Sequence, residues 1–217
     1  MRIAYVVDVH GRFAVVNKAA AAIGPVDALI VGGDITTAGT PADAQEAIAG
    51  WQSLAPRLLA VAGNMDSAAI DARLVELGIS IDGRGVMLGH VGVFGASAAP
   101  VSPLRTPHEL TEYELERRIE QGYAEVAGAR LTIFCPHAPP LDTACDRLPD
   151  GRHVGSAAVR SFVERAQPDV VLCGHIHESR GRDELGRSQI VNPGPAPDGH
   201  YAVVDVGDRV AVTLDGE

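Results

Sequence analysis

Residues 171–177 read Val-Leu-Cys-Gly-His-Ile-His, an apolar run that passes through glycine into two histidines. Such a run predicts a buried strand, and a His-x-His spacing on a strand places both imidazoles on one face. Four other apolar runs pass into polar residues in the same way: Val6-Val7 before Asp8 and His10, Leu29–Val31 before Asp34, Leu59–Val61 before Asn64, and Ile133–Cys135 before His137. Ligand sites in layered α/β folds lie outside the carboxyl ends of the strands. The five runs therefore predict one shared site.

Outward from these runs, strands alternate with helix-period stretches early in the chain and follow one another directly near its end. The predicted strands are 3–7, 28–31, 58–61, 91–94, 131–134, 170–172, 189–191, 201–206 and 210–214. The predicted helices are 13–23, 42–54, 68–77, 109–126 and 157–167. Alternation early and consecutive strands late predict an α/β or α+β layered domain.

No repeat, low-complexity tract or linker divides the 217 residues, so the sequence predicts a single domain over 1–217. One stretch departs from the strand–helix pattern, because residues 96–106 read as a proline-containing loop and a glutamate-rich helix follows them. We interpret about 96–127 as a cap-like insertion beside the site. The alternative is a solvent-exposed helix face supported by a few ion pairs.

Charge and composition narrow the range of partners. The chain holds 18 Lys+Arg and 28 Asp+Glu, a formal net charge of -10 at pH 7. An acidic surface disfavours long nucleic acids and anionic membranes. Three cysteines without paired spacing, and no apolar run long enough to span a bilayer, indicate a cytoplasmic protein. The sequence does not indicate an oligomeric state.

Seven potential metal ligands follow the five predicted strands: Asp8, His10, Asp34, Asn64, His137, His175 and His177. Imidazole, carboxylate and amide donors together suit Mn, Fe, Zn, Ni or Co. Seven donors exceed what one open catalytic site needs but suit two divalent ions that share a carboxylate. Two such ions activate water and stabilise charge on phosphorus oxygens. The set therefore predicts phosphoester hydrolysis by attack of a metal-bridging hydroxide.

In their order along the chain, five segments resemble the five motifs of the calcineurin-like metallophosphoesterases: Asp8-Val9-His10, Gly33-Asp34, Gly63-Asn64, Pro136-His137 and Gly174-His175-Ile176-His177. Residues 137–140, 151–156, 174–178 and 192–194 further resemble the Icc-related predicted phosphoesterases of bacteria and archaea. The resemblance implies a four-layer αββα sandwich in which helices flank two mixed β-sheets. It also implies how the ligands divide: Asp8, His10 and His177 bind one ion, Asn64, His137 and His175 bind the other, and Asp34 bridges them.

One position departs from the family pattern. Many members carry, directly after the asparagine, a histidine that protonates the leaving group, whereas this chain has Met65, whose thioether cannot donate a proton. The absence of this histidine favours a phosphodiester substrate, or a leaving group that is stabilised in another way. His153 and His108 are candidate replacement donors, and a solvent-facing or capping role is the alternative for each. Asp66 is expected to be the N-cap of the helix over 67–77.

The sequence thus predicts a metal-dependent phosphoesterase that acts on a small phosphate ester, with phosphodiesters favoured and manganese as the most suitable metal. Asn64 would also polarise a phosphoryl oxygen. A phosphomonoesterase or protein phosphatase is the alternative within enzymes. A non-catalytic metal-binding scaffold is the alternative outside them, because a relative in the eukaryotic membrane-sorting coat uses this fold to bind partners after losing several ligands. All seven ligands are present here, which argues against a scaffold.

Overall fold

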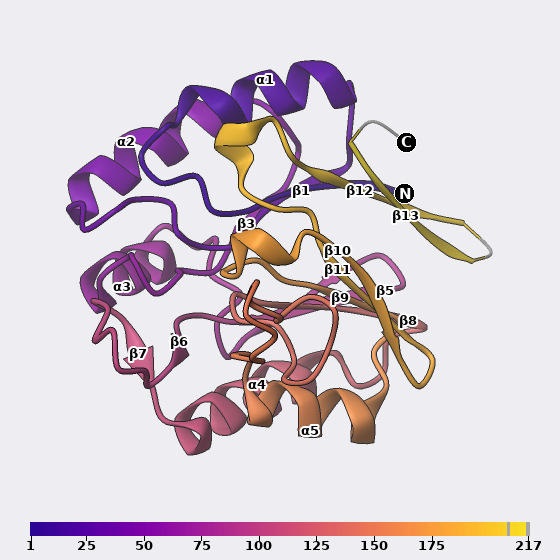
Figure 1. Ribbon diagram of the computed structural model, residues 1–217. Helices are drawn as coiled ribbons and strands as arrows, with labels where there is room; N and C mark the ends of the chain where they lie inside the picture. Colours follow the sequence, from indigo (N-terminus) through magenta and orange to yellow (C-terminus); the bar gives the residue numbers. More distant parts are fainter. Residues whose placement is uncertain (208, 216–217) are drawn as a thin grey trace.

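Two mixed β-sheets face each other, and helices cover the outer face of each sheet (Figure 1). This computed structural model describes residues 1–207 and 209–215. The first sheet contains β1 (Arg2–Val6), β2 (Ala28–Val31), β3 (Leu58–Ala60), β12 (Ala202–Val206) and β13 (Val210–Leu214). The second contains β4 (Gly85–Leu88), β5 (Val91–Ala96), β8 (Leu131–Pro136), β9 (Val170–Leu172), β10 (Gly181–Leu185) and β11 (Ser188–Asn192).

The remaining elements are helices and one short ladder. The helices are α1 (Ala14–Ile23), α2 (Pro41–Trp51), α3 (Ala68–Glu76), α4 (Glu112–Val126) and α5 (Ala157–Ala166), with the 3₁₀ turns η1 (His177–Ser179) and η2 (Ala196–Asp198). The short ladder pairs β6 (Ala99–Pro100) with β7 (Glu109–Leu110). No helix within residues 1–207 and 209–215 is long and apolar enough to cross a membrane.

Sheet topology brings the parallel strands together. The first sheet has the order β13-β12-β1-β2-β3, in which β1, β2 and β3 run parallel. The second has the order β10-β11-β9-β8-β5-β4, in which β5, β8, β9 and β11 run parallel. In the first sheet β12 and β13 add antiparallel pairs on the β1 side, and in the second sheet β4 and β10 pair antiparallel at the two edges. The sandwich is the four-layer arrangement that the family resemblance implies.

Strand alternation explains how β1 joins two cores. Ile3, Tyr5 and Val7 face the second sheet, whereas Ala4 and Val6 face the helices. Successive side chains of a strand point to opposite faces, so a strand covered on both sides reads as a continuous apolar run. The core between the sheets is built from such inward-facing residues, so the two layers meet through apolar side chains.

Helices α1, α2 and α3 pack on the outer face of the first sheet, and α4 and α5 on that of the second. Aromatic rings dominate the second outer layer. Phe94 and Phe134 stack with centroids 4.7 Å apart, and Phe162 of α5 meets both rings edge-on at 5.6 and 5.2 Å. Ile119 and Val126 of α4 belong to the same cluster. Helix α4 therefore forms part of the outer layer.

All nine predicted strands and five predicted helices are present, with ends that differ by three residues or fewer. Four strands were not predicted: β4, β6, β7 and β10. β4 and β10 are the edge strands of the second sheet. An exposed edge strand tolerates charged residues, and β10 reads Gly-Arg-Asp-Glu-Leu, so it lacks the apolar run that the prediction relied on. Helix α4 begins at Glu112 and not at 109, since Thr111 is its N-cap and forms a capping box with Glu114.

Asp66 does not cap a helix, so that prediction is wrong. Ser67 is the N-cap of α3 and accepts a hydrogen bond from the backbone N–H of Ile70. Asp66 is fully buried and accepts hydrogen bonds from the N–H groups of Ile35 at 3.0 Å, Thr36 at 2.8 Å and Gly63 at 2.9 Å. Its carboxylate therefore fastens the loop after β2 to the loop after β3.

We predict that Asp66→Ala lowers the free energy of unfolding by at least about 2 kcal/mol, because it leaves buried N–H groups without acceptors. Equilibrium urea denaturation measures the change. The matched control is Asp43→Ala, which removes an exposed carboxylate from the capping box of α2 and should lower the free energy of unfolding clearly less. Equal losses in the two variants would contradict the fastening role of Asp66.

Candidate metal centre

The carboxyl ends of β1, β2 and β3 in one sheet and of β8 and β9 in the other meet at one end of the sandwich (Figure 1). All seven predicted ligands follow these strands along the chain. The loops after β1, β2 and β3 of the first sheet carry Asp8, His10, Asp34 and Asn64. The loops after β8 and β9 of the second sheet carry His137, His175 and His177. Both sheets thus contribute donors to the same place.

The ring and amide atoms form two groups. In one, His10 Nε2 lies 3.2 Å from His177 Nε2. In the other, Asn64 Oδ1 lies 3.1 Å from His137 Nε2 and 2.8 Å from His175 Nδ1. In each group, nitrogen and oxygen atoms of types that bind transition metals lie within 3.2 Å of a neighbour.

The buried carboxylates of Asp8 and Asp34 each lie near histidines of both groups. Asp34 places Oδ2 3.7 Å from His10 Nε2 and Oδ1 3.6 Å from His137 Nε2, so it stands between the groups. Asp8 Oδ2 lies 3.7 Å from His177 Nε2. The ligand atoms of Asp8, His10 and His177 all lie within 4.8 Å of one another, as do those of Asp8, Asp34 and His137. The set could hold two ions.

Neighbouring groups orient the imidazoles. His137 Nδ1 lies 2.9 Å from the carbonyl oxygen of Gly32, which can only accept, so Nδ1 carries the proton and Nε2 presents its lone pair to the cluster. On the other ring, His10 Nδ1 bonds Thr37 Oγ1 at 3.0 Å and leaves Nε2 toward the cluster. Hydrogen bonds of this kind on the far ring nitrogen are typical of metal-binding histidines.

Burial shifts the ionisation of the cluster toward neutrality. It raises the pKa of Asp8 and of Asp34, and each of these is raised further by a nearby acid. It lowers the pKa of His10 to about 4 and that of His175 to about 4, with the proximity of His177 adding to both. The His–Asp contacts are therefore not ion pairs at neutral pH, and a cation between these groups would favour the ionised carboxylates.

The donor set fits a cation for a specific reason. His137 is fully buried, its pKa is lowered well below the usual value by burial, and its Nδ1 proton is committed to Gly32. Its Nε2 is consequently an acceptor that faces two oxygens, Asn64 Oδ1 at 3.1 Å and Asp34 Oδ1 at 3.6 Å. Three atoms that converge in this way need a proton or a metal cation between them, so the set suits a bound cation.

Backbone strain marks the same loops. Asp8, His10, Asp34 and His175 have φ angles of 55°, 50°, 49° and 68°, in the left-handed region that non-glycine residues seldom adopt. Such conformations persist where surrounding structure enforces them, and they cluster at functional sites. Gly63 allows the loop after β3 to lie close to Asp34, because a Cβ at Gly63 would lie 2.0 Å from Asp34 Oδ1.

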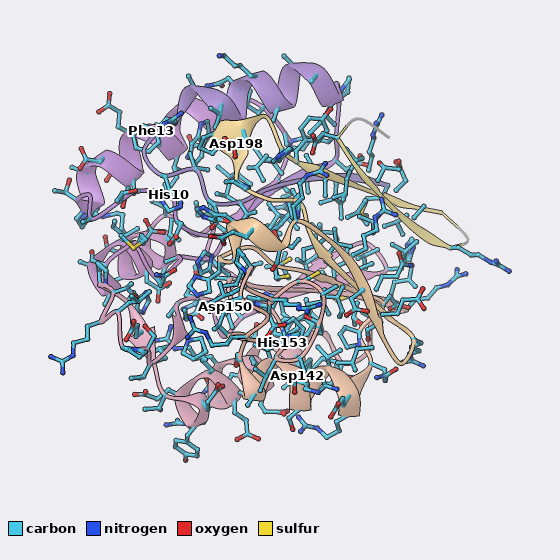
Figure 2. All side chains as sticks on the ribbon, viewed as in Figure 1. His10, Phe13, Asp142, Asp150, His153 and Asp198 are labelled. Atoms are coloured by element: carbon cyan, nitrogen blue, oxygen red, sulfur yellow. The ribbon has the colours of Figure 1, made fainter. Side chains whose placement is uncertain are left out.

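The two candidate proton donors differ in their surroundings. His108 is buried, and its ring interacts electrostatically with Asp71 and Arg118, away from solvent. His153 lies on the loop between β8 and α5, lower in the view than His10 (Figure 2). Its Nδ1 lies 2.6 Å from Oδ1 of Asp146, and its side chain is 32% exposed. Of the two, His153 is the accessible one.

Three residues that support the site were not predicted: Thr37 beside His10, Asp146 beside His153, and Ser97 behind Asn64. Thr37 and Asp146 lie in polar loops where many side chains could form such a bond. Ser97 is 35 residues from the backbone N–H whose hydrogen bond it accepts. No sequence signal distinguishes it.

Comparison with known proteins identifies the family of the chain. Residues 1–209 match the calcineurin-like phosphoesterase superfamily domain. An uncharacterised protein of Methanocaldococcus jannaschii is 29% identical over 219 residues, which cover 99% of this chain and 96% of that protein.

Two solved structures share the fold. The protein TT1561 of Thermus thermophilus has a TM-score of 0.75 at 18% identity, and the match covers 98% of this chain and 97% of that one. A dimetal phosphatase from Danio rerio has a TM-score of 0.68 at 12% identity, and the match covers 99% of this chain and 95% of that one. With the match to the family over residues 1–209, the chain belongs to the calcineurin-like phosphoesterase superfamily.

Proposed function

We propose that this protein hydrolyses a small phosphate ester with two divalent metal ions, and that phosphodiesters are its preferred substrates. The observation that carries the proposal is the position of Asp34, which lies 3.7 Å from His10 Nε2 and 3.6 Å from His137 Nε2. One carboxylate thus reaches both groups of donors. Membership of a superfamily of phosphoesterases supports the same reaction class.

The ligands would divide as the two groups do. Asp8, His10 and His177 would hold one ion, Asn64, His137 and His175 the other, and Asp34 would bridge them. We expect Mn²⁺ there, with Fe, Zn, Ni and Co as alternatives that also accept imidazole and carboxylate ligands. Bound there, the ions would supply a nucleophile from water near neutral pH and offset negative charge on the phosphoryl oxygens.

The protein's own residues set the limits of this chemistry. Neutral imidazoles keep their lone pairs available without losing a proton first, because their pKa values are already low. Met65 follows Asn64 and offers no proton to a leaving group, although its backbone N–H donates to Asp34 Oδ1 at 2.7 Å. A leaving group that needs little protonation, as in an activated diester, suits this arrangement.

We predict that Asp34→Asn and His137→Ala each lower Mn²⁺-dependent hydrolysis of bis(p-nitrophenyl) phosphate by about 10³-fold or more, because each removes a ligand from the reacting centre. Calorimetric titration with Mn²⁺ should find two bound ions in the unaltered protein and fewer in either variant. His90→Ala, which alters an exposed histidine in the β4–β5 turn, is the matched control and should keep both properties.

Other outcomes would select the alternatives. Higher kcat/KM on mono-aryl than on bis-aryl phosphates would indicate a monoesterase or protein phosphatase. Fewer than one bound ion per folded chain after Mn²⁺ loading would indicate a non-catalytic scaffold. Two bound ions without hydrolysis of diesters, monoesters or pyrophosphates would contradict the enzymatic function.

The proton that Met65 cannot supply is proposed to come from His153. Asp146 is fully buried and accepts hydrogen bonds from the N–H groups of Asp142, Thr143 and Gly155 at 3.1, 2.9 and 2.9 Å. Its remaining partner is His153 Nδ1 at 2.6 Å. This bond holds the ring through Nδ1, so Nε2 is on the side of the ring that does not contact Asp146. Within residues 1–207 and 209–215, Nε2 has no hydrogen-bond partner.

The loop that carries His153 is fastened near the metal ligands. It begins at His137, and Ser179 of η1 donates from Oγ to the carbonyl oxygen of Arg147 at 2.5 Å. Arg147 pairs with His153 across an antiparallel bridge, and η1 begins at His177. The His153–Asp146 pair is therefore attached to both ends of the ligand set contributed by the second sheet.

We predict that His153→Gln lowers kcat/KM for diphenyl phosphate, whose phenolate is a poor leaving group, by about 100-fold. The same variant should change kcat/KM for bis(p-nitrophenyl) phosphate by about fivefold or less. A general acid matters most where the departing oxygen is basic. Asp146→Asn should show the same pattern with smaller losses, and Mn²⁺ binding should not change. Equal effects on the two substrates, including no effect on either, would rule out His153 as the donor.

A further inference from the structure

The turn that presents Asn64 is held from behind by a segment that joins β5 to β7. The backbone N–H of Ala62 donates to Ser97 Oγ at 2.9 Å, and the N–H of Ala98 donates to the carbonyl oxygen of Ala62 at 2.9 Å. The N–H of His108 donates to the carbonyl oxygen of Asn64 at 3.0 Å. Both sides of the turn are thus bonded to residues 97–108.

Ser97 connects this turn to two acidic side chains. Its hydroxyl accepts from Ala62 and donates to Asp71 Oδ1 at 2.8 Å, while its backbone N–H donates to Asp82 Oδ1 at 2.7 Å. The residue is fully buried. A hydroxyl can accept and donate at once, so serine meets both needs with one atom.

Arg118 of α4 completes the connection. Its Nη1 lies 3.1 Å from Asp71 Oδ2 and also contacts Asp82 Oδ2. The side chains of Asp71 and Asp82 are only 11% and 9% exposed, so their charges require a buried partner. Burial raises the pKa of Asp82 to about 6, with Asp71 adding to the rise and Arg118 opposing it. The guanidinium therefore keeps both carboxylates in place to bind Ser97.

Within residues 1–207 and 209–215, the hydrogen bonds of Ser97 and of its neighbours lead to one of the two donor groups. These bonds end at Ala62, two residues before Asn64, and at Asn64 itself, which belongs to the Asn64–His137–His175 group. The other group has different direct partners, because His10 bonds Thr37 and the N–H of Asp8 donates to the carbonyl oxygen of Gly33. One hydrogen bond, from the N–H of His175 to Asp8 Oδ2 at 3.0 Å, joins the two groups. A disturbance at Ser97 should therefore alter the Asn64 group far more than the other.

We propose that Ser97, held by Asp71 and Arg118, is a positioning residue that fixes Asn64 and so sets the metal affinity of the Asn64–His137–His175 group. The proposal rests on the proposed two-metal function. It assigns a role to the segment expected to be a cap: residues 97–108 act beneath the site, through the backbone of the Asn64 turn.

The test measures Mn²⁺ affinity of the full chain by calorimetry, without substrate, in two single-group backgrounds. His10→Ala leaves the Asn64 group, and His137→Ala leaves the His10 group. Ser97→Ala should weaken Mn²⁺ binding about tenfold or more in the first background and less than about twofold in the second. Arg118→Met should reproduce the effect, and Arg118→Lys, which keeps the charge, should restore part of the affinity.

The control is Ser188→Ala, another fully buried serine, whose Oγ has no hydrogen-bond partner within the described chain. It should leave both affinities unchanged. Equal weakening in the two backgrounds would show general loosening of the fold and overturn the positioning role, as would unchanged affinity in both. If the unaltered protein fails to bind two ions, the proposed function fails first, and that outcome is read from the unaltered protein alone.

Discussion

The structure depends on burying two carboxylates beside neutral imidazoles. Asp8 and Asp34 are 0% and 2% exposed, and no lysine or arginine pairs with either among residues 1–207 and 209–215. Buried negative charge without a cation is costly, and proteins accept it where a metal or a proton completes the site. The position of the parallel strands, the left-handed loop residues and the tight glycine turns all serve to bring these groups together.

Loops that hold such a cluster need support from outside it. Asp66 fastens the Asp34 loop to the Gly63 turn from the side of the first sheet. Ser97 holds the same turn from the side of the second sheet, and Asp146 plays a comparable part for His153. Each support is a buried oxygen that accepts hydrogen bonds from backbone N–H groups of the loops.

The sequence was sufficient to predict nine strands, and to predict that the seven candidate ligands lie near one another, because each follows an apolar run. It was insufficient where partners lie far apart along the chain. Ser97 is 35 residues from Ala62, and nothing near it in sequence indicates the bond. Asp66 was assigned to a helix cap because it precedes Ser67, whereas its partners lie on another loop. Edge strands β4 and β10 were missed because exposure removes the apolar signal.

Four of the seven donors come from the first sheet and three from the second. The core between these layers is built from apolar side chains, whose attraction is not directional. In the proposed metal-loaded protein, ions held by both sheets would act as directional crosslinks across that plane. Ligand binding that favours the folded chain adds to its stability by mass action. The availability of the metal would then govern how long the folded protein survives, as well as whether it is active.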